Sequence, residues 1–274
     1  MKRLIDRFFA IRVPVGRIQA ICLGLLPILL GLAVWFSLTR GPIETRHGSG
    51  LVPQPNEVAN AGYKLITRQD QTRNIYKAAM DSLRRVSLGF LIAMAICLPI
   101  GIAMGSFSRV QALMEPLMTF GTYTPIAVLV PLTMSWFGTD EKQKVGFLAI
   151  AGICYLLPAI FRSVCQVDDV FLQTAYTLGA TKRHIVTKIL IPISAADAFD
   201  AMRMAFSVGW TWIMVAEAIA AETGLGKMIE VARGRGQRSD IVYFLVLLIV
   251  AIGFVIDKAF AWTGRQLFPY RNAR

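Results

Sequence analysis

Apolar runs of roughly membrane-spanning length recur along the chain and are separated by polar segments. A transmembrane helix needs about 20 mainly apolar residues to cross the hydrocarbon core of a bilayer. The segments that approach this requirement are residues 18–38, 83–106, 116–136, 145–161, 196–220 and 241–262. The pattern therefore predicts an all-α, polytopic membrane protein with about six transmembrane helices.

A polar stretch at residues 173–192, QTAYTLGATKRHIVTKILIP, separates the fourth and fifth predicted spans. Asp168 or Asp169 can cap a helix that begins near Val170, because a carboxylate accepts hydrogen bonds from the unpaired amides of the first turn. Gly179 can adopt the left-handed conformation that closes a helix. We expect a short helix that ends at this glycine.

A second short helix is predicted directly after the glycine. Thr181 can cap a helix over residues 182–190, and Pro192 is expected to end it because proline cannot continue a helix. The whole insert is therefore predicted to be a helix, a sharp turn and another helix.

The first of these helices carries a small apolar face. Phe171, Leu172, Ala175 and Leu178 fall on one side at helical spacing, with no evident core of their own to bury them. Two interpretations remain open on periodicity alone. The face binds a partner protein, or it lies against the bilayer surface or the chain's own spans.

The composition excludes a soluble domain. Of the 274 residues, 55% are hydrophobic and 17% are charged, and the mean hydropathy is +0.55. The net charge of +12 would suggest nucleic acid binding in a soluble protein. Here the Lys and Arg residues lie in loops and at the ends of apolar runs, so anchoring to anionic lipid headgroups is the better interpretation.

The sequence shows no pattern typical of an enzyme or a metalloprotein. The four cysteines have no CxxC spacing, there is no histidine cluster, and no glycine-rich phosphate loop appears. The chain is therefore predicted to be non-catalytic, with no bound cofactor and no energy source of its own.

The topology is predicted from the first basic cluster and the number of spans. Five Lys and Arg residues precede the first span, which favours a cytoplasmic N-terminus. Six spans then place the C-terminus and residues 162–192 in the cytoplasm as well. Residues 222–240 are too polar to span, and they are interpreted as a short amphipathic helix at the outer surface.

The polar insert resembles the loop signature of permease subunits of bacterial ABC importers. That signature reads Glu-Ala-Ala, three residues, glycine, nine residues, isoleucine, one residue and Leu-Pro. This chain matches it at Ala175, Gly179, Ile189 and Pro192. It departs from it with Gln173 for glutamate, Thr174 for alanine and Ile191 for leucine.

Further segments are similar to the nitrate, sulfonate, taurine and bicarbonate branch of the same binding-protein-dependent transport family. These segments are LVPQPNEVAN, SLRRVSLGF, TPIAVLVPLTMSWFG and GWTWIMVAEAIAAETGLG, and together they extend the resemblance over most of residues 51–265. The resemblance implies a type I importer permease fold in the bacterial inner membrane.

The same resemblance implies a division of labour between subunits. A second permease copy would complete the pore, two cytoplasmic ATPase subunits would bind ATP and Mg²⁺, and an outer solute-binding protein would deliver a small anion or organic solute. Residues 1–82 would form an N-terminal helix and outer loop, residues 83–265 the permease core with a coupling loop at 164–192, and residues 266–274 a cytoplasmic tail. The main alternative is a secondary transporter or channel that works without ATP.

Two groups of site residues follow from these considerations. The ATPase-coupling residues are predicted to be Phe171, Leu172, Gln173, Thr174, Ala175, Leu178, Gly179, Ala180, Ile189 and Pro192. The residues predicted to lie along the translocation path are Thr124, Pro125, Pro131, Thr133, Ser135, Arg203, Trp210, Trp212 and Glu217.

Several path residues have a structural alternative. Charged side chains inside spans are costly, so Arg203 either faces the path or extends to the cytoplasmic headgroups. Glu217 either contacts the cargo or makes a structural hydrogen bond to a neighbouring helix or the outer loop. Trp210 and Trp212 either contact the cargo or anchor the helix at the membrane interface.

Overall fold

The computed structural model describes residues 16–39, 52–67, 74–234 and 238–270, and every regular element among them is helical. The chain divides into two compact units, Met1–Asn60 and Ala61–Arg274. The all-α prediction is confirmed for these described ranges.

The first unit is built around α2 (Arg17–Leu38). None of the residues in its apolar window is buried, which suits a helix surrounded by lipid. Two hydrogen bonds join its C-terminal end to the proline-rich segment that leads into α3 (Pro55–Ile66): Trp35 Nε1 donates to Pro53 O at 3.1 Å, and Gln54 Nε2 donates to Thr39 O at 3.1 Å.

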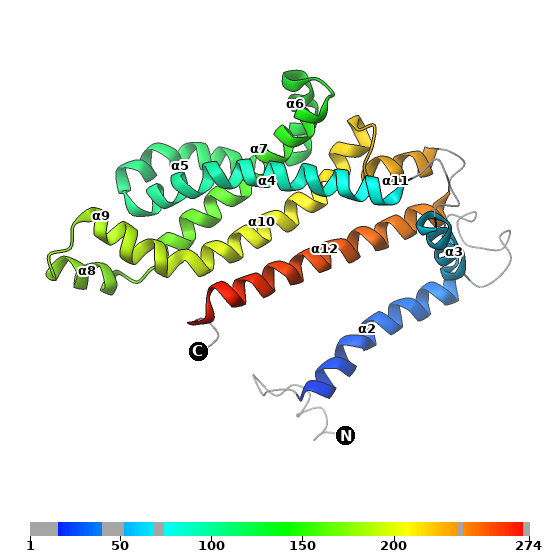
Figure 1. Cartoon of the computed structure of the whole chain (residues 1–274), viewed down its shortest axis with the longest axis horizontal. Helices are drawn as coiled ribbons and strands as arrows, with labels where there is room; N and C mark the ends of the chain where they lie inside the picture. The colour runs from blue at the N-terminus through cyan, green and yellow to red at the C-terminus, as the bar shows by residue number, and fades with distance from the viewer. Residues whose placement is uncertain (1–15, 40–51, 68–73, 235–237, 271–274) are drawn as a thin grey trace. The chain divides into compact units, whose positions relative to one another are not determined.

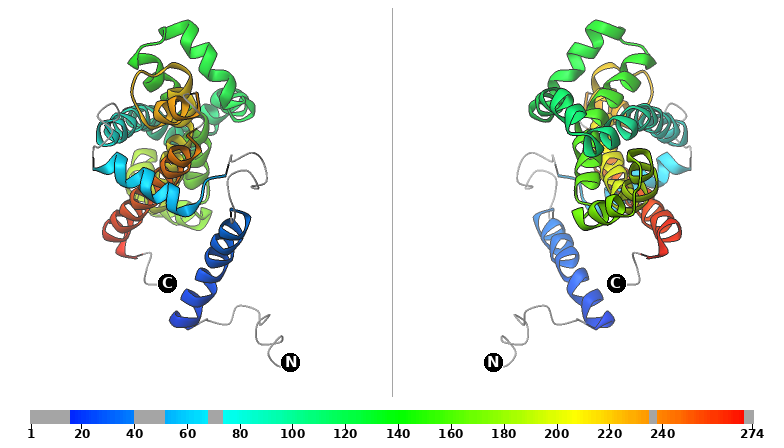
Figure 2. Two further views of the ribbon diagram at one scale, coloured as in Figure 1. Left: turned by 90° about the vertical axis from the view of Figure 1, so that its right-hand side faces the viewer. Right: turned by 90° about the vertical axis from the view of Figure 1, so that its left-hand side faces the viewer.

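Four long helices dominate the second unit: α4 (Ile75–Ser106), α7 (Glu141–Cys165), α10 (Ile191–Ala220) and α12 (Ser239–Leu267). Helix α10 packs against the other three, and α4 lies along α7 (Figure 1). Their contact surfaces form the main core, which includes Val86, Phe147 and Ile213. Figure 2 shows this bundle from its two ends, and the right-hand view faces the end that carries α8 and α9.

Glycines allow α4 and α7 to approach closely. A Cβ added at Gly89, Gly101 or Gly105 would lie 2.6 Å from Leu148 Cβ, 2.7 Å from Ile160 Cγ2 and 2.6 Å from Val164 Cβ, respectively. Small residues at a helix interface bring two backbones together and increase van der Waals contact, which is a main source of helix association within membranes. The two helices therefore pack closely from Gly89 to Gly105 of α4.

The span predicted at residues 116–136 is sharply bent rather than one straight helix. The structure has α5 (Ser108–Tyr123), a break, a 3₁₀ turn at Ile126–Val128 and α6 (Leu129–Phe137), and the two helices meet at 88°. Pro125 has no amide hydrogen and disfavours helical geometry at the residue before it. Thr124 is accordingly extended, with φ −73° and ψ 121°, and the helix bends there.

The prediction that Pro192 ends a helix is wrong. After α9 (Lys182–Ile185), a π-helical turn at Val186–Leu190 leads directly into α10, and Ile191 N bonds to Val186 O. Proline is tolerated in the first turn of an α-helix, where an amide would have no intrahelical partner. The wider π turn resets the hydrogen-bonding pattern just before the proline, so the chain continues as helix.

The remaining predicted spans all lie in helices, with shifted boundaries. By length and composition, four helices in the described part of the chain could cross a membrane, and the bent pair α5 and α6 raises the number to five. Helix α10 has 30 residues but carries Asp197, Asp200, Arg203 and Glu217, and it is not among the five. Counting α10, the total reaches the predicted number of about six. The amphipathic helix predicted within residues 222–240 is present as α11 (Leu225–Gly234).

Candidate functional site

Helix α8 (Asp169–Thr177) follows α7 after a short turn and is capped as predicted. Asp168 Oδ1 accepts a hydrogen bond from Val170 N at 3.0 Å, and Asp169 lies in the first turn. A carboxylate at this end also interacts favourably with the partial positive charge of the helix N-terminus. Of the two predicted caps, Asp168 is the one that makes the bond.

A left-handed glycine closes α8. Gly179 has φ +76°, its amide donates to Tyr176 O at 3.0 Å, and Ala180 N donates to Ala175 O at 2.9 Å. These two bonds form a Schellman motif, a common way for a helix to end at a left-handed glycine. Thr181 Oγ1 then accepts from His184 N at 3.4 Å and caps α9. The predicted helix, the glycine turn and the start of the second helix are confirmed, whereas the end predicted at Pro192 is not, because the chain continues through the π turn into α10.

The apolar face of α8 is divided between a small core and solvent. Ala175 is buried and Leu172 is half-buried, and both pack against Val164, Ile185 and other residues of a separate cluster at this end of the bundle. The expectation that this face has no core of its own is therefore wrong for these two residues. The predicted residues Ala180 and Ile189 pack against the same cluster.

The other apolar side chains of α8 face outward. Val170 is 62% exposed, Phe171 50% and Leu178 82%. Gln173 and Thr174 are also exposed on this helix, and Pro192 is exposed at the start of α10. The inward residues fix α8 on the bundle, and the outward residues present an apolar surface with no partner within the described chain.

The predicted path residues on α5 and α6 do not form one cluster. Pro125, Pro131 and Ser135 are exposed, and Thr124 is half-buried with its hydroxyl bonded to Phe120 O. Thr133, by contrast, is fully buried.

The hydroxyl of Thr133 bonds within the protein. Its Oγ1 accepts from Gln143 Nε2 at 3.0 Å and lies within bonding distance of the Leu129 and Val130 carbonyls. Thr133 therefore joins α6 to α7.

The predicted path residues of α10 other than Glu217 contact neighbouring helices. Trp210 is buried and donates from Nε1 to Ile249 O of α12 at 3.1 Å, and Trp212 is half-buried against the main core. Arg203 forms a two-bond ion pair with Asp257 of α12, at 2.5 Å from Nε to Oδ1 and 2.6 Å from Nη2 to Oδ2. This partner for Arg203 was not among the sequence-based alternatives.

Arg85 is the centre of a buried polar network at the opposite end of the bundle from α8. Its guanidinium donates to both carboxylate oxygens of Glu141 and to Glu217 Oε1, each at 2.7 Å. It also donates to Thr223 O at 2.7 Å and to Thr223 Oγ1 at 3.1 Å. One side chain of α4 thus joins α7, α10 and the segment before α11.

Glu217 receives three further contacts in this network. Ser82 Oγ donates to its carboxylate at 2.8 Å, and Gly226 N donates to Oε2 at 3.0 Å. The Ser82 hydroxyl in turn accepts from Leu225 N at 3.0 Å. The carboxylate is fully buried, so Glu217 makes the structural hydrogen bonds that were the alternative to contact with cargo.

Sequence reasoning named Glu217 but missed Arg85 and Ser82 as its partners. Both lie in the SLRRVSLGF segment, which was used only as a resemblance. A buried arginine needs carboxylate partners, so the adjacent pair Arg84 and Arg85 in an apolar helix was the available signal.

The network requires a residue without a side chain at position 226 of α11. A Cβ at Gly226 would lie 2.5 Å from Met214 O, and the Gly226 amide cannot retreat without losing its bond to Glu217. We expect Gly226→Ala to lower the free energy of unfolding by about 1–3 kcal/mol, as overpacking does. Thermal unfolding of the purified chain in detergent measures the change.

Gly234→Ala is the matched control within the same helix. A Cβ at Gly234 meets nothing within 4 Å, so we expect a change within about 0.5 kcal/mol. Equal destabilisation by both substitutions would contradict the close approach at Gly226.

The site contains no arrangement suited to metal binding, since no group of three or more His, Cys, Asp or Glu side chains gathers in the described ranges. The structure has a capped helix, α8, with an exposed apolar surface at one end of a membrane-spanning bundle. At the other end it has the buried network of Arg85 and Glu217. A bundle of membrane-spanning helices that presents such a surface is the fold and site of a membrane transport permease.

Comparison with known proteins identifies the family. The family described as binding-protein-dependent transport system inner membrane component matches residues 95–268. The chain belongs to this family, and it is accordingly a permease subunit of an ABC importer.

Individual relatives match along much of the chain. The taurine transport system permease protein of Escherichia coli is 26% identical over 275 residues, covering 99% of this chain and 97% of the relative. The bicarbonate transport system permease protein of Synechococcus elongatus is 25% identical over 206 residues, covering 75% and 74%.

A solved structure of the MetNI methionine ABC transporter in inward-facing conformations aligns with a TM-score of 0.62. The alignment covers 70% of this chain and 95% of that chain. At 16% identity the similarity supports the fold alone.

Proposed function

We propose that α8 and the Gly179 turn dock into a cytoplasmic ATPase subunit and transmit its motion to the spans. The observation that carries this proposal is the exposed apolar surface of α8, with Leu178 82% exposed beside the glycine turn. Such a surface on a rigidly capped helix suits insertion into a groove on a partner protein.

The transport cycle follows from this contact. ATP and Mg²⁺, held by the two ATPase subunits, draw those subunits together, and the docked α8 helices carry the movement into the bundle. The spans then change from an inward-facing to an outward-facing arrangement as rigid bodies. This chain contributes contact surfaces and packed helices, and the hydrolysis belongs to its partners.

We further propose that two copies of the chain enclose the pore. Helix α5 has no buried residue, and Leu113, Leu117 and Phe120 follow one another at helical spacing on it, all exposed. A second copy would cover this apolar face and place the exposed residues Pro125 and Ser135 near the pore. Both termini and α8 would lie in the cytoplasm, and α11 would face an outer solute-binding protein.

The proposed cargo is a small anion or organic solute of the taurine, sulfonate, nitrate or bicarbonate class. Relatives named for taurine and bicarbonate transport support this class. The charge of Arg203 is balanced by Asp257, so the structure gives this chain no unpaired deep cation for cargo at that position. Selection among these anions is assigned to the binding protein.

Affinity purification of the tagged chain in mild detergent tests the assembly. We expect an ATPase subunit to copurify in equal amounts, and the complex in proteoliposomes to take up the ligand of its binding protein only with ATP. Uptake by the chain without ATP would instead establish the secondary transporter or channel alternative.

A further inference from the structure

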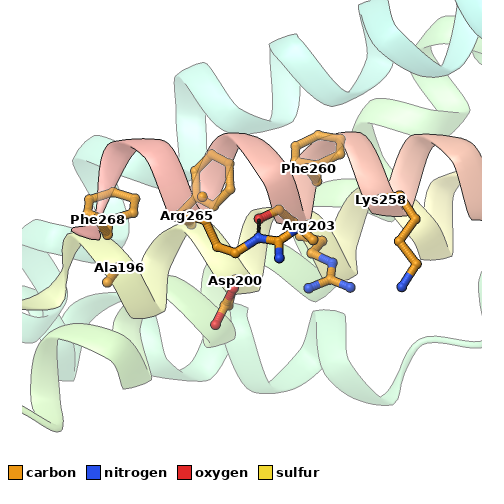
Figure 3. Close-up of a pocket in the computed structure, with 10 residues that line it drawn as sticks. Ala196, Asp200, Arg203, Lys258, Phe260, Arg265 and Phe268 are labelled. Carbon is orange, nitrogen blue, oxygen red and sulfur yellow. Dashed lines mark hydrogen bonds between the residues drawn. The ribbon is translucent and has the colours of Figure 1, made fainter. Parts of the chain in front are cut away.

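A cavity of about 350 Å³ lies between α10 and α12, near the start of one helix and the end of the other. Figure 3 shows the side chains that surround it, with Asp200 and Arg203 from α10 and Lys258 and Arg265 from α12. This cavity plays no part in the coupling contact proposed for α8.

The lining of the cavity together with the neighbouring Asp257 has one positive charge in excess. It holds Arg203, Lys258 and Arg265 against Asp200, and the adjacent Asp257 is engaged by Arg203 through two hydrogen bonds. Three cations therefore face two carboxylates. A single phosphodiester would balance this excess.

Lys258 and Arg265 are available for an anion. Lys258 Nζ lies 5.1 Å from the centre of the Phe254 ring, and Arg265 Nε bonds to the Ala261 carbonyl at 3.3 Å. Neither residue forms an ion pair with a carboxylate in the part of the chain that the structure describes. Both side chains are exposed, so a ligand can reach them from outside the bundle.

Aromatic rings form the apolar side of the cavity. Phe199 of α10 contacts Phe260 and Phe268, with ring centres 5.9 Å and 5.8 Å apart. The cavity therefore combines cations with an apolar wall. This combination suits an amphipathic anion better than a fully hydrated one, because the rings can bury apolar atoms of the ligand.

The cavity lies at the end of the bundle that carries α9. Ala196 in its lining is four residues beyond Pro192, and Tyr270 Oη donates to Pro192 O at 3.4 Å. This is the end at which α10 begins and α12 finishes, so in a membrane the cations stand near a lipid headgroup layer. Basic pockets between spanning helices at such a boundary bind anionic headgroups.

We propose that this cavity binds one anionic phospholipid of the surrounding bilayer, with the phosphodiester against Lys258 and Arg265 and the adjoining glycerol and acyl carbons against the phenylalanines. A soluble phosphate or sulfonate shares the anionic chemistry but lacks the apolar part. The lipid is the source that uses both halves of the lining.

Native mass spectrometry of the purified full-length chain tests the proposal. The chain is titrated with phosphatidylglycerol, which has one net negative charge, or with zwitterionic phosphatidylcholine, and the bound lipid is counted. We expect one phosphatidylglycerol to bind at least about tenfold more tightly than phosphatidylcholine, and the double variant Lys258→Gln, Arg265→Gln to lose most of that preference.

Three controls make the outcome decisive. Lys142→Gln removes an exposed cation from the start of α7, at the opposite end of the bundle from the cavity, and should leave the preference unchanged. The exchange Lys258→Arg, Arg265→Lys keeps both charges and should also retain it, which shows that the two positions tolerate substitution and that their charge carries the preference. Glycerol phosphate, the soluble arm, should fail to displace the lipid at equal concentration.

The proposal is overturned if the chain does not distinguish the two lipids, or if Lys142→Gln weakens binding as much as the double variant. Displacement of the lipid by equimolar glycerol phosphate would assign the cavity to a soluble anion instead. None of these results depends on docking by α8, so the proposed coupling function stands or falls separately.

Discussion

Replacing Gly179 by valine is expected to abolish cargo-stimulated ATP hydrolysis by the assembled transporter, while the chain still inserts into the membrane. Gly179 has φ +76°, a region that a β-branched residue enters only at a cost of about 1–2 kcal/mol or more. The chain would relieve this strain by opening the Schellman turn, and α8 would lose its fixed direction. ATPase activity of the reconstituted complex, with and without loaded binding protein, measures the effect.

The matched control is Gly179→Asn. A Cβ at position 179 meets nothing within 4 Å, so side-chain bulk is not the obstacle, and asparagine is the residue other than glycine that best tolerates left-handed geometry. We expect the asparagine variant to keep most of the coupling. Normal stimulation in the valine variant would count against docking by α8, and equal failure of both variants would count against the backbone explanation.

Replacing Arg85 by methionine is expected to destabilise the chain by about 3–5 kcal/mol, the cost of removing one partner from a buried ion pair. The substitution leaves the fully buried carboxylate of Glu217 without its cation, and it removes the bonds to Glu141 and Thr223. The yield of folded protein in detergent and its thermal unfolding temperature report the loss.

Arg84→Met is the control for Arg85→Met. Arg84 is the preceding residue on the same helix but is exposed, so its removal should change the free energy of unfolding by less than about 1 kcal/mol. Adding Glu217→Gln to Arg85→Met should restore part of the stability, because the uncompensated charge disappears. If Arg84→Met is as harmful as Arg85→Met, the network is not what stabilises this end.

The local chemistry of the coupling segment could be predicted because it depends on neighbours in sequence. Asp168, Gly179 and Thr181 each form a hydrogen bond to a backbone group no more than three residues away. The residue type alone therefore predicts the cap or the turn, and in the structure each of the three residues makes the cap or turn predicted for it.

The two helix errors come from prolines whose effect depends on context. Residues 116–136 were predicted as one span, but α5 ends at Tyr123, because Thr124 before Pro125 is extended. Pro192 was expected to stop a helix, yet a π turn precedes it and α10 continues. Proline forbids one hydrogen bond, and the surrounding helices decide whether the chain breaks or adjusts.

The polar partners inside the bundle could not be predicted because they are distant in sequence. Ser82 and Glu217 are 135 positions apart, and Arg203 and Asp257 are 54 apart. The cost of a charge in a span shows that a partner exists, but it does not say which residue supplies it. Likewise, the burial of Ala175 depends on Ile185 and Val164, which only the folded chain brings together.

The close glycine packing of α4 against α7 has a consequence for how the two ends communicate. Helix α7 has 25 residues and is therefore about 38 Å long; it begins at Glu141 in the Arg85 network and ends three residues before Asp168. Packed in this way, the two helices can move together as one rigid rod. If this rod pivots near its middle, a tilt of about 5° moves the two ends of α7 by about 2 Å each, in opposite directions. In the coupling role proposed for α8, a displacement of α8 would therefore also move the Arg85 network at the other end of α7.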